Sequence, residues 1–143
     1  MRIKIKRIDK SLPLPQYQTP GSVGFDISSR INAVINPGEI TILPANLIVE
    51  VPIGHALILS ARSSLAKNGL KLANGVGIID QDYHGPKDEI GILVHNFTHA
   101  PVEIKKGDRL AQALIMPVEQ VEWEEIKEIK TESRGGFGST GKS

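Results

Sequence analysis

Residues 33–59 read AVINPGEITILPANLIVEVPIGHALIL, and this stretch decides the fold class. Short runs rich in Ile, Val and Leu alternate in it with the turn signals Asn36-Pro37-Gly38, Pro44-Ala45-Asn46 and Pro52-Ile53-Gly54. Such runs, bounded by Pro, Gly and Asn, are typical of strands joined by tight turns. The stretch therefore predicts consecutive β-strands over 33–35, 39–43, 47–51 and 56–59.

The same pattern continues on both sides of this stretch. Ile3 and Ile5 alternate with lysines, and apolar runs of strand length return at 90–95, 102–104 and 110–118. Many short strands at regular spacing predict an all-β protein, built as a jelly-roll-like β-barrel. Segment 118–129 is interpreted as a further strand, because Val121 and Trp123 lie two residues apart.

Length and composition limit the possible functions. A chain of 143 residues predicts a single domain over 1–143. Its net charge of +1 excludes a strongly basic duplex-binding protein, so we expect no nucleic-acid partner. Cys is absent, which excludes disulfides and thiolate metal sites. Residues 1–10 lack the apolar core of a signal peptide and no run approaches a membrane span, so we expect no membrane partner and a cytoplasmic location.

The C-terminal segment 131–143 has a different composition from the rest of the chain. It contains no Ile, Leu or Val and is dominated by Gly, Ser and Thr, which predicts a flexible flap. Residues 136–143 match the letters of a P-loop, but a P-loop needs a strand before it and a helix after it. Two interpretations stay open: a disordered tail, or a flap whose Phe137 stacks on a base while its neighbours grip a phosphate.

Three other segments combine polar residues with turn signals. Residues 61–66, Ala-Arg-Ser-Ser-Leu-Ala, start the one short helix that we predict, over 63–68 with Ser63 as N-cap and Gly69 as its end. This is an oxyanion site or only a capped helix beside a solvated arginine. In 74–85, Asp80 follows an Ile-Ile pair and is a candidate to polarise a water, whereas Asp82 is more typical of a turn. Residues 107–112, Gly-Asp-Arg-Leu-Ala-Gln, look like a turn that enters a strand.

Taken in order, these segments resemble the trimeric deoxyuridine triphosphate nucleotidohydrolases (dUTPases). Counterparts of the five family motifs lie at 21–27 (GSVGFDI), 61–66, 75–85, 107–112 and 134–141 (RGGFGSTG). The resemblance implies a β jelly-roll homotrimer that hydrolyses dUTP to dUMP and diphosphate with Mg²⁺. It also implies active sites shared between subunits, with the fifth motif closing over each site as a tail.

The resemblance further implies a role for each matching residue. Asp80 is identified as the base that activates the attacking water, and Tyr83 as the wall that leaves no room for a ribose 2′-hydroxyl. The uracil edge is read by Asn74 and by the backbone of Gly77, Ile78 and Ile79. Phosphates are held by Arg62, Ser63, Ser64 and Gln112. In the fifth motif Phe137 stacks on uracil beside Gly138, while Arg134, Ser139 and Thr140 hold the γ-phosphate. Asp26 touches Mg²⁺ only through water.

Two departures from the family pattern and two alternatives accompany this assignment. The stretch from Arg134 to Phe137 is two residues shorter than the usual Arg-Gly-x-Gly-Gly-Phe, which leaves the reach of Arg134 to the γ-phosphate open. Residues 86–89, Pro-Lys-Asp-Glu, lengthen the connection after the third motif. The alternatives are a dCTP deaminase of the same fold, which uses a glutamate on the strand after the third motif, and a non-catalytic nucleotide-sensing trimer. The matching strand, 90–96, holds no acidic residue, and Glu89 is the nearest.

Overall fold

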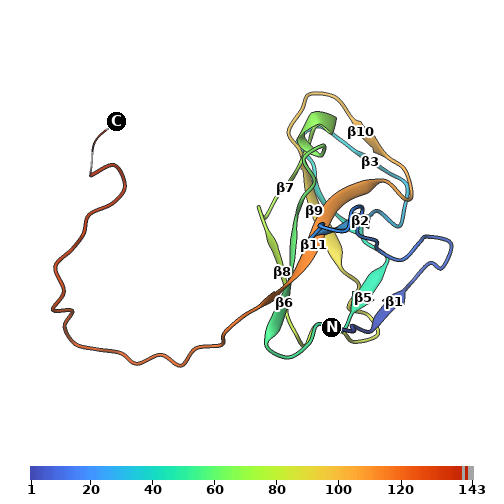
Figure 1. Cartoon of the computed structure of the whole chain (residues 1–143). Coiled ribbons are helices and arrows are strands. Elements are labelled where there is room, and N and C mark those ends of the chain that lie inside the picture. Colours follow the sequence, from blue (N-terminus) through green and yellow to red (C-terminus); the bar gives the residue numbers. More distant parts are fainter. Residues whose placement is uncertain (140, 142–143) are drawn as a thin grey trace.

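The computed structural model describes residues 1–139 and 141, and these form an all-β barrel with one turn of 3₁₀-helix (Figure 1). The elements in chain order are β1 (Ile5–Arg7), β2 (Phe25–Ser28), β3 (Ala33–Ile35), β4 (Ile40–Pro44), β5 (Leu47–Val49), β6 (His55–Ala61), η1 (Ala66–Asn68), β7 (Leu70–Leu72), β8 (Gly77–Ile79), β9 (Gly91–Asn96), β10 (Val102–Ile104) and β11 (Arg109–Pro117). Within these residues, no helix has the length and apolarity to cross a membrane.

All strand pairs are antiparallel. A four-stranded sheet has the order β2-β11-β6-β8, a three-stranded sheet has the order β4-β9-β7, and β1-β5 and β3-β10 form two ribbons. The longest ladder joins β6 to β11, from Ala61 opposite Ala111 to His55 opposite Pro117. β8 pairs with the other side of β6, with Gly77 opposite Leu59 and Ile79 opposite Leu57.

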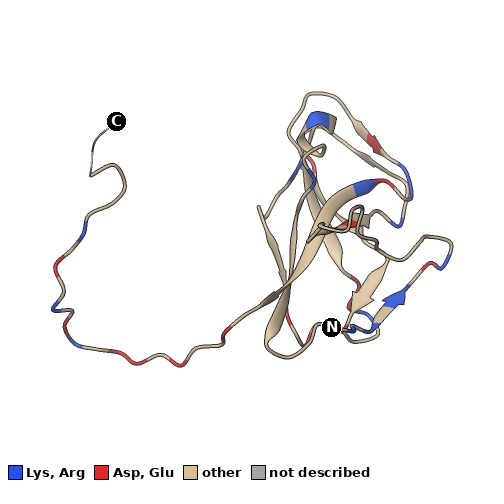
Figure 2. Cartoon of the chain, in the orientation of Figure 1, with Lys and Arg blue, Asp and Glu red and all other residues tan. Residues whose placement is uncertain are grey.

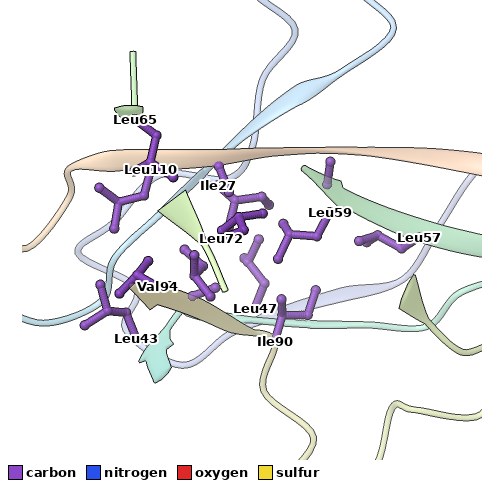
Figure 3. Close-up of a cluster of buried hydrophobic side chains, with 14 of the residues drawn as sticks. Ile27, Leu43, Leu47, Leu57, Leu59, Leu65, Leu72, Ile90, Val94 and Leu110 are labelled. Carbon is purple, nitrogen blue, oxygen red and sulfur yellow. The ribbon is translucent and has the colours of Figure 1, made fainter. Parts of the chain in front are cut away.

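The core lies between the sheets, because alternate residues of the strands turn inward. In β6, Leu57 and Leu59 are buried, and in β9, Ile92 and Val94 are buried. Figure 3 shows Leu57, Leu59 and Val94 among core side chains from the surrounding strands: Ile27, Leu47, Leu72 and Leu110. Each fully buried Leu or Ile contributes about 1.5–3 kcal/mol of hydrophobic stabilisation, so the inward face of the strands stabilises the barrel.

The structure confirms the predicted all-β class and most predicted strands, and it corrects three details. The helix is shorter than predicted: it begins at Ala66, its N-cap is Leu65, and no serine side chain caps it. It ends as predicted at Gly69, whose φ of +86° is the left-handed conformation that glycine favours. Strands β2, β7 and β8 were not predicted from the runs of apolar residues. The strand expected within 118–129 is absent, since no described strand pairs with residues 119–129.

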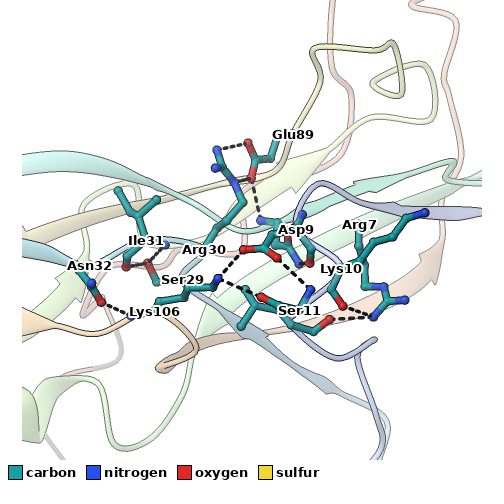
Figure 4. A network of polar contacts seen from close by, with 12 residues as sticks. Arg7, Asp9, Lys10, Ser11, Ser29, Arg30, Ile31, Asn32, Glu89 and Lys106 are labelled. Atoms are coloured by element: carbon teal, nitrogen blue, oxygen red, sulfur yellow. Dashed lines mark hydrogen bonds and ion pairs between the residues drawn. The ribbon is translucent and has the colours of Figure 1, made fainter.

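A network of polar contacts ties the N-terminal loop to the barrel (Figure 4). The Asp9 carboxylate pairs with the Lys106 ammonium and accepts a hydrogen bond from the Ser11 N–H. These contacts, with Lys106 the strongest, lower the pKa of Asp9 well below its ordinary value. Nearby, Glu89 accepts two hydrogen bonds from the Arg30 guanidinium, which raise the pKa of Arg30.

Beyond β11 the chain leaves the barrel. Val118 still donates its N–H to the Gly54 carbonyl at 2.9 Å, but the described residues from 119 to 139 are all exposed. Figure 1 shows this segment running away from the strands as an extended tail, and Figure 2 shows acidic and basic residues following one another along it. The flexibility predicted for 131–143 stays a prediction.

Replacing Lys106 tests the electrostatic part of this network. A carboxyl group with a lowered pKa in the folded state stabilises it above the unfolded pKa of about 3.9, and that stability is lost as the pH falls. We therefore expect Lys106→Gln to reduce the free energy of unfolding at pH 7, and the gap to the native protein to narrow below about pH 4. Urea denaturation followed by circular dichroism at several pH values measures this gap. Lys105→Gln is the control, and an equal gap at pH 3 and pH 7 would contradict the assignment.

Candidate functional site

Strands β2, β11 and β6 bring residues of three predicted motifs together. Gln112 of β11 lies opposite Asp26 on one side and Ser60 on the other, and Arg62 directly follows β6. The Asp26 carboxylate forms ion pairs with two guanidinium groups, Arg62 Nε at 2.8 Å and Arg109 Nη1 at 3.0 Å. Gln112 donates its side-chain amide to the Ala61 carbonyl at 3.2 Å. We call Asp26, Arg62, Arg109 and Gln112 the arginine cluster.

An open cavity of about 550 Å³ adjoins the arginine cluster and is lined by polar residues that include Arg62, Ser64 and Arg109. Arg62 and Arg109 stay partly exposed, with 28% and 49% of their side chains accessible. Arg62 Nη1 also donates to the Arg109 carbonyl at 3.4 Å. Ser63, next to Arg62, is also exposed. Guanidinium groups with hydroxyl donors are the usual protein ligands of phosphate. Glu103 and Asp108 also line the cavity, so only the side formed by Arg62, Ser64 and Arg109 suits an anion.

Arg109 was not singled out by the sequence reasoning. It precedes the buried Leu110 in the Gly107–Gln112 motif, where its only signal is an exposed position on a strand. Its pairing with Asp26 spans 83 residues of chain and depends on β11 lying beside β2. One carboxylate, that of Asp26, pairs with two guanidinium groups. The arginine cluster therefore has a net charge of +1.

A second group of predicted residues lies on the turn that joins β7 to β8. These two strands do not pair with each other, because β7 pairs with β9 and β8 pairs with β6, so the word hairpin below names only this connection. Its turn is closed by the Gly75 N–H donating to the Leu72 carbonyl and the Val76 N–H donating to the Asn74 carbonyl. Gly77 allows β8 to lie close to β6, because a Cβ atom there would be only 3.2 Å from the Leu59 Cβ. β8 is the last strand of its sheet among the described residues, so the backbone on its outer edge is free to bind a planar ring.

Asp80 comes directly after β8 and is exposed. Its carbonyl accepts a hydrogen bond from the Tyr83 N–H at 3.2 Å, which closes a turn. The side chain of the next residue, Gln81, accepts a hydrogen bond from the Gly54 N–H at 2.7 Å. Tyr83 is half-exposed, and its hydroxyl donates to the Glu89 carbonyl at 3.2 Å. The hairpin with Asp80 and Tyr83 is called the Asp80 hairpin below.

One chain does not bring the arginine cluster and the Asp80 hairpin together. Ile79 lies opposite Leu57, whereas Arg62 follows the other end of β6. Five residues of strand span about 17 Å, so Asp80 and Arg62 are separated by most of the length of β6. The cavity beside Arg62 contains no residue of the Asp80 hairpin. The predicted site is therefore divided into two parts within a single subunit.

The third part, the fifth motif, lies on the tail and far from both groups (Figure 1). Gly136 donates its N–H to the Ser139 hydroxyl at 2.8 Å, and Ser139 donates its own N–H to the Gly136 carbonyl. This turn carries Phe137 at its tip, with a φ of +50° and a fully exposed ring. Arg134 and Gly138 are exposed as well. Thr140, also predicted to bind substrate, lies outside the described residues.

The described residues contain no group of three His, Cys, Asp or Glu side chains placed to hold a metal ion. Asp26 is the carboxylate of the arginine cluster, and both of its oxygens already pair with guanidinium groups. Mg²⁺ in nucleotide enzymes is commonly held by substrate phosphates with one or two carboxylates and several waters. The described residues therefore fit an ion that arrives on the substrate phosphates, and the predicted contact of Asp26 with Mg²⁺ through water stays a prediction.

A profile of the family described as dUTPase matches residues 10–141. This chain belongs to the dUTPase family. Its relatives include proteins named deoxyuridine 5'-triphosphate nucleotidohydrolase from Nautilia profundicola and from Anaplasma marginale, each 41% identical. The alignments cover 99% of this chain in both cases, and 100% and 99% of those relatives.

Solved dUTPase structures share the fold. A variant of the Staphylococcus bacteriophage 80alpha dUTPase with dUpNHpp superposes with a TM-score of 0.86 at 24% identity, over 98% of each chain. The dUTPase of Streptococcus mutans gives a TM-score of 0.76 at 29% identity, over 83% of this chain and 98% of that one. A variant dUTPase from phage phi11 of S. aureus, described with a structural Mg(II) ion, gives 0.82 at 22% identity, over 92% and 100%. These matches confirm the predicted dUTPase-like barrel.

Proposed function

We propose that this member of the dUTPase family hydrolyses dUTP to dUMP and diphosphate. The observation that carries the proposal is the carboxylate of Asp80, which directly follows β8, the edge strand of the four-stranded sheet. The relatives named above act on deoxyuridine triphosphate by name, and they align with this chain over nearly its whole length. The cytoplasmic location expected from the sequence belongs to the same proposal.

The Asp80 hairpin supplies the specificity for a uracil deoxynucleotide. The edge backbone of Gly77, Ile78 and Ile79 and the amide of Asn74 provide donors and acceptors for the polar edge of uracil. Because Gly77 holds β8 close to β6, the hairpin is tight, and we propose that it excludes the 5-methyl group of thymine. Tyr83 packs against the sugar and leaves no space for a 2′-hydroxyl.

The arginine cluster binds the phosphates. A triphosphate carries about four negative charges near neutral pH, and these must be neutralised before an oxygen nucleophile attacks phosphorus. Arg62 donates to phosphate oxygens, the hydroxyls of Ser63 and Ser64 and the amide of Gln112 complete the donor set, and Asp26 holds Arg62 in place. Bound Mg²⁺ supplies further positive charge across the phosphates and orients them.

Asp80 acts as the general base. Its carboxylate orients a water and accepts a proton from it while the water oxygen forms a bond to the α-phosphorus. The bond from the α-phosphorus to the bridging oxygen breaks, and diphosphate leaves with that oxygen. The protein contributes mainly position and electrostatic stabilisation, as is usual in phosphoryl transfer.

The division of the site supports a homotrimer with shared active sites. The Asp80 hairpin of one subunit and the arginine cluster of another must meet, since they are separated on one chain. The described tail residues from 119 onward are all exposed, and Val121, Trp123, Ile126 and Ile129 form a series of exposed apolar side chains that a partner surface would cover. We propose that the tail crosses to a neighbouring subunit, where Phe137 stacks on uracil and Arg134, Ser139 and Thr140 reach the γ-phosphate.

The structure disfavours the deaminase alternative. β9 carries no acidic residue, and the nearby Glu89 carboxylate is turned to Arg30 and to the Asn46 N–H. A direct test is to incubate the purified protein with Mg²⁺ and each deoxynucleoside triphosphate and to measure diphosphate and ammonia. Diphosphate from dUTP alone supports the proposal. Ammonia from dCTP would favour the deaminase, and binding of dUTP without any product would favour the nucleotide sensor.

Asp80→Asn tests the assigned base. The amide keeps the size of the side chain but accepts no proton at neutral pH, so we expect turnover to fall by about 10²–10⁴-fold. Binding of a non-hydrolysable dUTP analogue, measured by calorimetry, should persist. The matched control is Asp82→Asn, which changes an exposed carboxylate two residues away. Turnover of Asp80→Asn close to that of the native enzyme would refute the assignment.

Truncation after Glu132 tests the flap. The described residues removed make no contact with the barrel in this chain, so we expect folding and trimer formation to be preserved. The loss of Phe137 and its neighbours should lower kcat/KM for dUTP severely, because the flap excludes water and grips the phosphates. Circular dichroism, light scattering and diphosphate release measure the three properties. A chain shortened only by residues 142–143 is the control, and full activity after truncation at Glu132 would exclude a catalytic flap.

A further inference from the structure

Tyr83, proposed above to face the sugar, is tethered through its hydroxyl group. The Tyr83 hydroxyl donates to the Glu89 carbonyl at 3.2 Å, across the loop that contains residues 84–88. The ring itself is 39% exposed, so packing alone does not fix its position. The position of the Glu89 carbonyl therefore helps to fix the position of the Tyr83 ring.

The peptide group that accepts this hydrogen bond is firmly anchored. The N–H on the same peptide unit, that of Ile90, donates to the Leu47 carbonyl of β5 at 2.9 Å. The Glu89 carboxylate accepts Arg30 Nε at 2.7 Å and Arg30 Nη2 at 3.0 Å, and it also accepts the Asn46 N–H at 2.8 Å. Only 18% of the Glu89 side chain is exposed, so this bidentate ion pair is largely shielded from solvent (Figure 4). Its two parallel hydrogen bonds fix the orientation of both side chains.

The connection at 86–89, predicted from the sequence to be longer than the family pattern, is the loop that this anchor holds. Its turn closes on itself, because the Asp88 carboxylate accepts the Gly85 N–H at 2.6 Å, while Pro86 and Lys87 are exposed. A longer loop has more freedom unless its ends are held. Tyr83 lies at one end of this loop, and Glu89 ends it at the first residue bound to the barrel.

We propose that Glu89, clamped by Arg30, is a positioning residue that holds the Tyr83 ring and thereby sets the preference for deoxyribose over ribose nucleotides. This inference rests on the proposed function, since it concerns the sugar of the same substrate. Glu89 touches no substrate in this account. It acts only through the Tyr83 hydroxyl, and that separates it from a residue that merely stabilises the barrel.

The test is a double-mutant cycle read out as the ratio of kcat/KM for dUTP to kcat/KM for UTP. Tyr83→Phe keeps the ring and removes only the tether, so we expect this ratio to fall about fivefold, the effect of one neutral hydrogen bond. Glu89→Gln weakens the clamp and should lower the ratio in the same direction. The double variant should lose no more than Tyr83→Phe alone, because both changes act through one tether. The control is Glu39→Gln. The Glu39 carboxylate directly precedes β4 and accepts the Asn36 N–H, and it has no contact with Tyr83 or Glu89 in the described hydrogen bonds.

The outcomes separate this inference from the proposed function. If the native protein releases no diphosphate from dUTP, the proposed function fails and the inference falls with it. If the native protein is active but Tyr83→Phe keeps the native dUTP-to-UTP ratio, only the tether is refuted. Additive losses in the double variant would show that Glu89 acts structurally, and that result also overturns the inference. Should Glu89→Gln fail to fold, Tyr83→Phe alone still decides, since it leaves the clamp intact.

Discussion

The antiparallel ladder between β6 and β11 positions most of the functional segments of this dUTPase-family chain. It runs from Ala61 opposite Ala111 to His55 opposite Pro117, in the middle of the four-stranded sheet. Its two ends have different tasks. One end presents Arg62 and Gln112 beside Asp26, and the other end holds the turn that contacts Gln81 and Val118. A change of register by one residue would exchange the inward and outward faces of both strands and remove these contacts.

The charges of the site explain why it is built in parts. Two arginines side by side repel each other, and Asp26 between them relieves that repulsion while leaving donors for an anion. The acidic Asp80 stands about the length of β6 away, where it does not weaken the positive potential of the arginine cluster. In the homotrimer proposed above, the acidic element of one subunit would meet the basic element of another.

The strands that the sequence predicted share one property. Runs such as 33–35, 40–44 and 102–104 are apolar and bounded by strong turn signals, so local composition is enough to identify them. The missed strands β2 and β8 are less apolar: β8 begins with Gly77, and β2 contains Asp26 and Ser28. They form strands because β11 pairs with β2 and β6 pairs with β8. Segment 118–129 shows the reverse case, since its alternation predicts a strand that the isolated chain cannot pair.

By itself, the sequence determined the all-β class and, through the order of five motifs, the residues proposed to handle uracil, sugar and phosphates. The fold class follows from local chemistry, because turn residues end strands. The residue assignments follow from the resemblance of the five motifs to those of the dUTPase family. Only the tertiary structure decided that Asp26 pairs with Arg109 across 83 residues, that Asp80 and Arg62 lie apart, and that Tyr83 is held by Glu89. Such contacts depend on which strands become neighbours and in which register, and that is set by the packing of the whole barrel.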